Sequence, residues 1–463
     1  MNEVLALSGT AQARMIRNRE ISSDELVNAH LRRIEQVNPS LNAVVEVLRA
    51  SPHVEGPLAG VPFSIKDSIE VKGAVCTAGT LGLRSAAASP CDATVVARLR
   101  AAGAIPMART NLPDLLFAFE SDNLIHGRTN NPYDLSRTSG GSSGGEAALI
   151  AACGSPFGLG SDAAGSVRVP AHFCGIASIK PTSGRLPRTG HVPPPGGWLE
   201  TLWQIGPMAR HVEDLITLMP FLVGPDGRDF TVVGMPYRDP AAVRLEDLRL
   251  AFFTDNGIVA ADPETVEVVR RAAAVVVNEV RSVDEQRPPG IEESYHLEMR
   301  LIGPDGGDGL RAFLAAIGST RTHPLLEGWL AKLEPYRTTL AGFAGYWAAL
   351  DQFRARMLSF LQNYDAILSP VCASAALPHG ASIEERTFLG FSYTMTHNLT
   401  GWPAAVVRCG QTESGLPIGV QIATHPWRED IGLKIAERLE ALCGGWKPSP
   451  LLHDASADRT SLR

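Results

Sequence analysis

The sequence has 463 residues, of which 44% are hydrophobic, and a formal net charge of −7 at pH 7. This length and apolar content are ample for a large buried core, whereas the acidic balance lacks the basic surface that nucleic-acid-binding proteins need. No apolar run reaches the roughly 18 residues of a membrane span, so we expect no transmembrane segment.

The cysteines and the N-terminal residues bear on the cellular compartment. Seven cysteines stand singly in the sequence, without a C-x-x-C pair. An odd number of isolated cysteines favours reduced thiols. The N-terminal segment carries charges too early and too often for a signal peptide. These two features together predict a cytoplasmic protein.

The N-terminal elements follow from hydrophobic periodicity. Apolar residues recur at helical spacing over residues 8–37. Ser22 or Ser23 is suited to cap a helix in this stretch, and we expect that helix to end at Pro39. Alternating and β-branched residues predict a strand over residues 41–47.

Residues 57–67, PLAGVPFSIKD, predict a short apolar strand that leads directly to Lys66. A lysine at the end of a buried strand is rarely needed for packing. The alternative is a surface lysine whose stem lies along apolar side chains. This stretch alone does not decide between a functional lysine and a surface one.

The next stretch alternates again between helix and strand. Residues 92–102 are amphipathic and predict a helix, and residues 105–111 predict a strand that runs into a loop. The apolar residues 115–119 fit either a core or the wall of a ligand pocket. The Asn, Pro and Asp cluster at 130–134 predicts a turn.

Two loops of small residues, 139–145 and 161–166, enclose the apolar run 147–153. Each loop presents a serine among glycines, which allow a ligand to approach the main chain closely. Consecutive N–H groups of such a loop can point into one concavity and stabilise a developing oxyanion. The pattern predicts a nucleophile loop with its own anion hole. A flexible linker is the alternative, but linkers are polar throughout.

The C-terminal half is less regular. Residues 190–197 are rich in proline and glycine and predict a loop close to the serine loops. Residues 243–253 predict a strand and residues 263–283 a helix. Residues 285–364 show little patterning and predict helices and loops. Residues 365–370 predict a buried strand.

The stretch around the two serine loops resembles the signature of the amidase signature hydrolases, especially the fatty acid amide hydrolase type. The matching motifs are GGSSGGE at 140–146, GLGSD at 158–162, GSVRVP at 165–170, FCG at 173–175 and KPT at 180–182. The resemblance covers about residues 5–445 and is weakest over 232–364. It implies a single α/β domain, residues 1–463, with a large mixed β-sheet covered by helices on both faces. Residues 285–364 would then be a variable helix and loop region that shapes the substrate entrance.

The resemblance also implies a catalytic triad of Lys66, Ser142 and Ser166. Ser166 would be the nucleophile, and Ser142, held through a cis peptide bond, would bridge it to Lys66. A lysine acts as a base only when it is neutral, which requires burial to lower its pKa. The reaction would pass through an acyl-enzyme on Ser166, with no metal and no other cofactor.

Further residues would support this triad. The resemblance implies an oxyanion hole made by the backbone N–H groups of Ala163, Ala164, Gly165 and Ser166. It implies a supporting role for three side chains that fix the loops: Ser143, Asp162 and Arg168. Ala164 departs from the glycine that is usual in the family; alanine keeps its N–H but adds a Cβ. Ser161 stands where threonine is usual.

A substrate pocket is implied by the same resemblance. Leu116, Phe117 and Phe119 lie where this family lines its acyl pocket, and Trp402 could add an aromatic wall. Phe391 stands where the glutaminase subunits of the family carry an acidic residue for the α-amino group of glutamine. We therefore expect apolar acyl or aryl amides, and also carbamates and esters, as substrates.

Other interpretations compete with this one. Residues 140–144 satisfy the G-x-S-x-G elbow of α/β-hydrolases, but that elbow follows a strand, and residues 131–139 are polar. The histidines show no metal-binding spacing. Two alternatives stay open: a glutamine-hydrolysing amidotransferase of the A type that works with a partner, and a catalytically silent binding protein. Otherwise we expect a monomer or homodimer whose partner is a small amide or carbamate.

Overall fold

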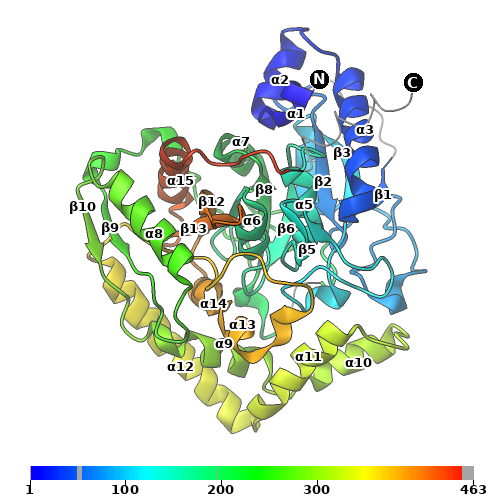
Figure 1. Ribbon diagram of the computed structural model, residues 1–463. Helices are drawn as coiled ribbons and strands as arrows, with labels where there is room; N and C mark the ends of the chain where they lie inside the picture. The colour runs from blue at the N-terminus through cyan, green and yellow to red at the C-terminus, as the bar shows by residue number, and fades with distance from the viewer. Residues whose placement is uncertain (1, 49–54, 195–196, 451–463) are drawn as a thin grey trace.

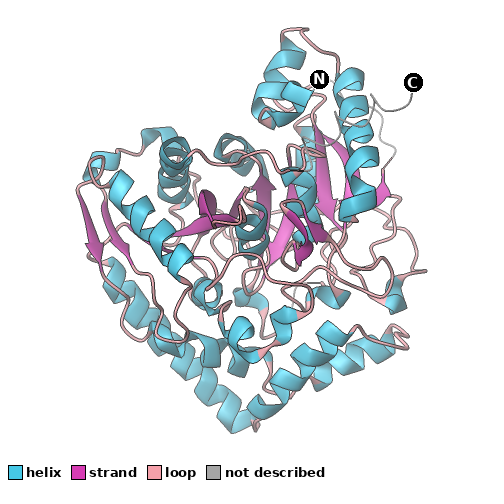
Figure 2. Ribbon diagram, viewed as in Figure 1, coloured by secondary structure: helices cyan, strands magenta, loops and turns pink. Residues whose placement is uncertain are grey.

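The computed structural model describes residues 2–48, 55–194 and 197–450. Eleven strands in this part of the chain form one sheet that crosses the molecule, in the order β1-β3-β2-β6-β8-β7-β12-β13-β11-β9-β10 (Figures 1 and 2). The strands are β1 (Val44–Val47), β2 (Pro62–Lys66), β3 (Ile105–Thr110), β6 (Phe157–Asp162), β7 (Ala177–Lys180), β8 (Gln204–Ala209), β9 (Arg249–Phe252), β10 (Ser282–Glu285), β11 (Ala366–Pro370), β12 (Ala404–Gln411) and β13 (Pro417–Thr424). A separate antiparallel ribbon pairs β4 (Asn130–Asn131) with β5 (Asp134–Thr138).

The sheet is mixed. β2 lies parallel to both β3 and β6, and β9 lies parallel to both β10 and β11. The strands between these two parallel blocks pair antiparallel. The carboxyl ends of β2 and β6 therefore meet at one edge of the sheet, where open α/β sheets bind their ligands.

Helices cover both faces of the sheet, as the sequence predicted (Figure 2). They are α1 (Asn2–Ala6), α2 (Gly9–Arg17), α3 (Ser23–Leu41), α4 (Thr94–Ala101), α5 (Gly144–Ala151), α6 (Arg168–Cys174), α7 (Val212–Leu222), α8 (Pro263–Val276), α9 (Ser294–Ile302), α10 (Asp308–Ala316), α11 (Pro324–Leu333), α12 (Leu340–Leu361), α13 (Glu385–Leu389), α14 (Ser392–Leu399) and α15 (Glu429–Cys443). None of the helices in the described residues has both the length and the apolar composition needed to cross a membrane.

Each face of the sheet has its own core. α4, α7, α8 and α15 contribute to one core, and α3, α5 and α6 contribute to the other. Side chains alternate between the two sides of a strand, and β11 illustrates this: Leu368 belongs to the first core, whereas Ile367 packs with α9 and α12 on the opposite side. Figure 1 shows α12 along the lower left edge of the molecule and α10 and α11 at the lower right.

Several predicted boundaries were wrong. The helical stretch 8–37 is two helices, and the second does not end at Pro39 but includes it. The helix continues to Leu41 because Asn42 adopts the left-handed conformation, and the Asn38 side chain accepts hydrogen bonds from the N–H groups of Ala43 and Val44. Ser22 is the N-cap, with a capping box to Glu25.

Two predictions in the C-terminal half were also too long. The strand predicted at 243–253 is only β9, because residues 245–247 form a 3₁₀ turn before it. The helix predicted at 263–283 stops at Val276, and the chain then turns into β10. Periodicity did not separate them because valines run through both elements. The buried strand predicted at 365–370 is present as β11.

Candidate active site

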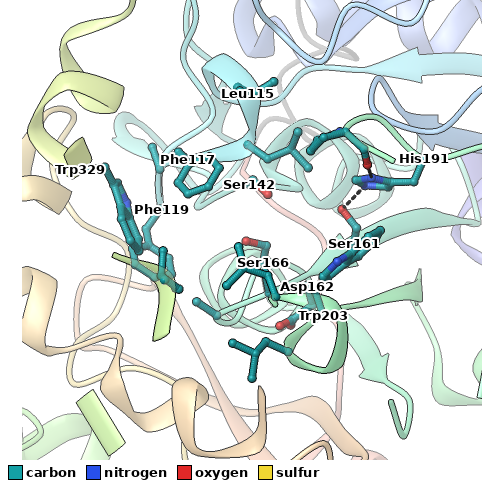
Figure 3. A pocket seen from close by; sticks show the side chains of 18 of the residues that line it. Leu115, Phe117, Phe119, Ser142, Ser161, Asp162, Ser166, His191, Trp203 and Trp329 are labelled. Carbon is teal, nitrogen blue, oxygen red and sulfur yellow. Dashed lines mark hydrogen bonds between the residues drawn. The ribbon is translucent and has the colours of Figure 1, made fainter. Parts of the chain in front are cut away.

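A cavity of about 270 Å³ opens above the carboxyl ends of β2 and β6. Most of its lining is apolar or aromatic, and its polar groups are serines, one histidine and two carboxylic acids (Figure 3). The lining residues are Leu115, Leu116, Phe117, Ala118, Phe119, Ser142, Ser161, Asp162, Ala163, Ala164, Ser166, His191, Pro193, Pro194, Leu199, Leu202, Trp203, Glu298, Ile302 and Trp329. A mainly apolar cavity with a few convergent polar groups is the usual form of a small-molecule site.

Lys66 lies beneath this cavity as the last residue of β2. Its Nζ is 2.6 Å from the Oγ of Ser142 and 3.1 Å from the Oγ of Ser161. Burial lowers the pKa of Lys66 to about 7, although the negative charges of Asp162 and Glu146 oppose the shift. A substantial fraction of Lys66 is therefore neutral near pH 7 and able to accept a proton.

Ser142 belongs to the loop before α5, and the Gly141–Ser142 peptide bond is cis. A Cβ added to Gly141 would lie 2.5 Å from the carbonyl oxygen of Ala118, which explains the glycine. Ser143 ties the two serine loops together: its N–H donates to the Ser166 carbonyl at 3.1 Å, and its hydroxyl donates to the Ser161 carbonyl at 3.3 Å.

Ser166 lies between β6 and α6, and its side chain faces the same cavity as Ser142 (Figure 3). In the described residues, its hydroxyl has no hydrogen-bond partner, and no hydrogen bond joins it to Ser142. The structure thus brings Lys66, Ser142 and Ser166 to one place, but it does not close the relay between the two serines.

The predicted oxyanion hole needs one correction. The N–H of Gly165 donates to the Oδ1 of Asp162 at 2.8 Å, so this donor is occupied. The N–H groups of Ala163, Ala164 and Ser166 have no acceptor within the described parts of the chain. Ala164 is absent from the positive-φ residues found there, so its Cβ causes no left-handed strain. Three donors remain for an oxyanion.

Asp162 and Arg168 form a buried ion pair beside this loop. The guanidinium contacts both carboxylate oxygens at 2.9 Å. It also donates to the carbonyl of Thr394 at 2.8 Å and to the side chains of Gln421 at 2.7 Å and Asn398 at 2.5 Å. Although burial opposes it, Arg168 holds the pKa of Asp162 below its usual range. Arg168 does not line the cavity.

Comparison with known proteins decides the family. A family model described as Amidase matches residues 25–431. The chain belongs to the amidase family. Enzymes of this family hydrolyse carbon–nitrogen bonds of amides, so this chain is an amide hydrolase, as its signature predicts.

The relatives of this amidase span its full length. It is 30% identical to fatty-acid amide hydrolase 2 of Homo sapiens, over 96% of this chain and 90% of the relative. It is 34% identical to the A-type component of the glutamyl-tRNA(Gln) amidotransferase of Syntrophobacter fumaroxidans, over 91% and 94%. A solved structure of 6-aminohexanoate cyclic dimer hydrolase with its substrate superposes with a TM-score of 0.87 at 28% identity, over 97% and 99%.

The predicted pocket residues of this amidase are divided by the structure. Leu116, Phe117 and Phe119 line the cavity. Phe391 and Trp402 do not, which corrects the prediction for both. Phe391 is fully buried and stacks on Phe119 with ring centroids 3.9 Å apart, so it supports the wall from behind. Trp402 packs beside His397 in another core region because the segment after α14 turns away from the cavity.

Sequence reasoning missed four cavity residues of this amidase: His191, Trp203, Glu298 and Trp329. Only His191 carried a signal, since it lies in the Pro/Gly-rich loop predicted near the site. Glu298 and Trp329 come from α9 and α11, where no motif exists. The ribbon β5, missed beside the predicted turn, precedes the first serine loop, but it lies outside the main sheet and so does not make the elbow of an α/β-hydrolase.

Proposed function

We propose that this amidase cleaves the C–N bond of apolar acyl or aryl amides through an acyl-enzyme on Ser166. The observation that carries the proposal is the buried contact of 2.6 Å between Lys66 Nζ and Ser142 Oγ, beside a cavity that also contains Ser166. An alcohol needs a base to become a nucleophile, and burial lowers the pKa of Lys66 to about 7.

In the proposed reaction, neutral Lys66 accepts the proton of Ser142, and Ser142 accepts the proton of Ser166. The Ser166 oxygen attacks the amide carbon, and the C=O electrons move to an oxyanion stabilised by backbone N–H groups. Losing one such donor typically costs ~3 kcal/mol. The C–N bond then breaks, Ser142 returns a proton to the leaving amine, and water hydrolyses the acyl ester on Ser166.

The proposed substrate class rests on the cavity wall. Phe117, Phe119 and Trp329 pack against one another with ring centroids 5.8–5.9 Å apart, and all three line the cavity. Burying an apolar side chain or substrate group of that size contributes ~1.5–3 kcal/mol. The relative named fatty-acid amide hydrolase 2 agrees with an apolar acyl group. Aryl carbamates and esters would fit the same space.

Glutamine hydrolysis with a partner is the second candidate. The relatives named as components of glutamyl-tRNA(Gln) amidotransferases favour it. Glu298 is a carboxyl in the cavity, but burial raises its pKa well above the ordinary value. A neutral carboxyl gives an α-ammonium group no charge partner, and such a loss costs ~1.5–3 kcal/mol.

Residues 285–364 are proposed to shape the entrance of this site. Glu298 and Ile302 on α9 and Trp329 on α11 support this, since all three line the cavity. This would make the divergent region the part of the chain that selects the substrate.

The test is a panel of glutamine, a short aliphatic amide, an acyl anilide and an aryl carbamate, hydrolysed by purified protein without a partner. We expect the highest kcat/KM for the anilide or the carbamate. If glutamine or the small amide is better by about tenfold, ~1.4 kcal/mol in transition-state binding, the apolar-substrate proposal is wrong.

A further inference from the structure

His191 is connected to Lys66 through one hydroxyl group. Its Nε2 lies 3.0 Å from the Oγ of Ser161, and that Oγ lies 3.1 Å from Lys66 Nζ. Figure 3 shows the imidazole bonded to Ser161 at the edge of the cavity, opposite the aromatic wall. Trp203 packs against the imidazole with ring centroids 4.6 Å apart and limits its rotation.

The tautomer of His191 follows from its second contact. Nδ1 lies 3.0 Å from the carbonyl oxygen of Pro193. A carbonyl only accepts hydrogen bonds, so Nδ1 carries the proton. Burial lowers the pKa of His191 to about 3; the Pro193 carbonyl opposes this shift, and the charges of Lys66 and Arg188 add to it. The ring is therefore neutral, and Nε2 is an acceptor.

An acceptor at this place fixes the direction of the next hydrogen bond. Ser161 has one hydroxyl proton, and donating it to Nε2 leaves only lone pairs facing Lys66. Lys66 must then donate to Ser161. A neutral amine has two N–H groups and one lone pair, so its lone pair stays free for Ser142, 2.6 Å away. Ser68, whose Oγ lies 3.1 Å from Nε2, can also only donate to it.

We propose that His191 is a positioning residue that directs the proton relay: by accepting the proton of Ser161, it reserves the lone pair of Lys66 for Ser142. This inference rests on the proposed function, in which Lys66 accepts a proton from Ser142. Without the acceptor, the Ser161 hydroxyl can turn and donate to Lys66, and it then competes with Ser142 for the same lone pair.

The first experiment replaces His191 in the full-length enzyme and measures kcat, KM and the pH profile on an acyl anilide. In His191→Phe we expect kcat to fall about tenfold to a hundredfold, the loss typical of a misdirected catalytic group, with KM unchanged. The acid limb should move to lower pH, because the Ser161 hydroxyl then stabilises neutral Lys66. Asp162, on β6, and Glu146, on α5, are the charged groups that act on Lys66, and neither is changed.

Conservative variants separate hydrogen bonding from packing. His191→Gln can place an amide oxygen near the Nε2 position, so kcat should stay within about threefold of the wild type. His191→Asn is too short to reach Ser161 and should behave like His191→Phe. If Gln and Asn variants are equally impaired, the proposal is overturned.

A double-mutant cycle with Ser161→Ala gives the decisive result. Ser161 carries the proposed effect, so His191→Phe should change kcat by less than about twofold in the Ser161→Ala background. An equal loss in both backgrounds would mean that His191 acts only through packing, which overturns the inference. Failure of the proposed function has a different signature: Ser166→Ala or Lys66→Ala would remain active, whatever the outcome of the cycle.

Discussion

Two sides of the cavity differ in how their polar groups are satisfied. The catalytic floor, Lys66, Ser142, Ser166, Asp162 and Arg168, comes from the ends of β2 and β6 and the starts of α5 and α6. Its two permanent charges are paired at 2.9 Å. The opposite wall, formed mainly by residues 115–119, 298–302 and 329, is aromatic and aliphatic.

Glu298 is the exception within this wall. It is fully buried, and neither of its carboxyl oxygens has a partner within the described residues. Burial is the first cause that raises its pKa, and Asp162 adds to the effect, while Arg168 and Arg354 oppose it. A fully bonded floor specifies one geometry, whereas a wall of non-directional contacts can accept different substrates. We therefore expect chemistry to depend on the floor and selectivity on the wall.

The largest effect should come from the nucleophile on the floor. Ser166→Ala should reduce kcat/KM by ~10³-fold or more, since loss of an attacking hydroxyl removes the covalent route. A fluorophosphonate should label the wild-type enzyme, and peptide mass spectrometry should locate the adduct on Ser166. An adduct on Ser142, or full activity in the variant, would contradict the assignment.

Lys66 should show the next largest effect. Its folded pKa of about 7 predicts that activity rises through about pH 7, as the amine loses its proton and becomes a base. Lys66→Ala should lose ~10²–10⁴-fold in kcat and should also lose this acid limb. EDTA should leave the wild-type rate unchanged. A variant that keeps the wild-type pH profile would exclude Lys66 as the base.

The wall should affect substrate choice more than chemistry. Trp329→Ala should reduce kcat/KM for an acyl anilide by roughly tenfold, ~1.4 kcal/mol, and should change that for a short aliphatic amide much less. Phe230→Ala is a matched control, because that aromatic side chain is 83% exposed and lies away from the cavity. Equal losses on both amides would show that the wall supports the floor instead of selecting substrates.

Glu298 allows the smallest and most specific test, on stability. Its folded pKa is raised, so the folded state holds a proton that the unfolded state releases above about pH 4.5, and stability falls as pH rises from there. Glu298→Gln removes this loss. The variant should match the wild type near pH 5 and exceed it by about 1–3 kcal/mol near pH 9.

Urea unfolding at these two pH values measures the difference for Glu298. Glu385→Gln serves as a matched control, because Glu385 is exposed on α13. An advantage of Glu298→Gln that is the same at both pH values would mean that ionisation of Glu298 is not responsible.

The same division explains what the sequence could predict. The floor lies in one continuous signature plus Lys66, so its residues and their neighbourhood were found without a structure. The occupied N–H of Gly165 was not foreseen, because it depends on how Asp162 turns back onto its own loop. The fold class followed from the resemblance, and errors occurred where one local signal was overruled, as at Pro39.

The wall was only half predictable. Phe117 and Phe119 stand beside the signature in the chain, whereas Glu298 and Trp329 reach the cavity through the packing of α9 and α11. Phe391 failed as a lining residue because a short sequence match cannot tell the front of a wall from the layer behind it.

The hydrogen bonds of Arg168 also have a consequence for synthesis on the ribosome. Its partners Thr394, Asn398 and Gln421 follow it by 226, 230 and 253 residues. The loop that holds Ser166 therefore lacks most of its anchors until β13 has left the exit tunnel. A nascent chain, or a product truncated before β13, would carry the entire signature and still be inactive, so hydrolysis begins only when translation is almost complete.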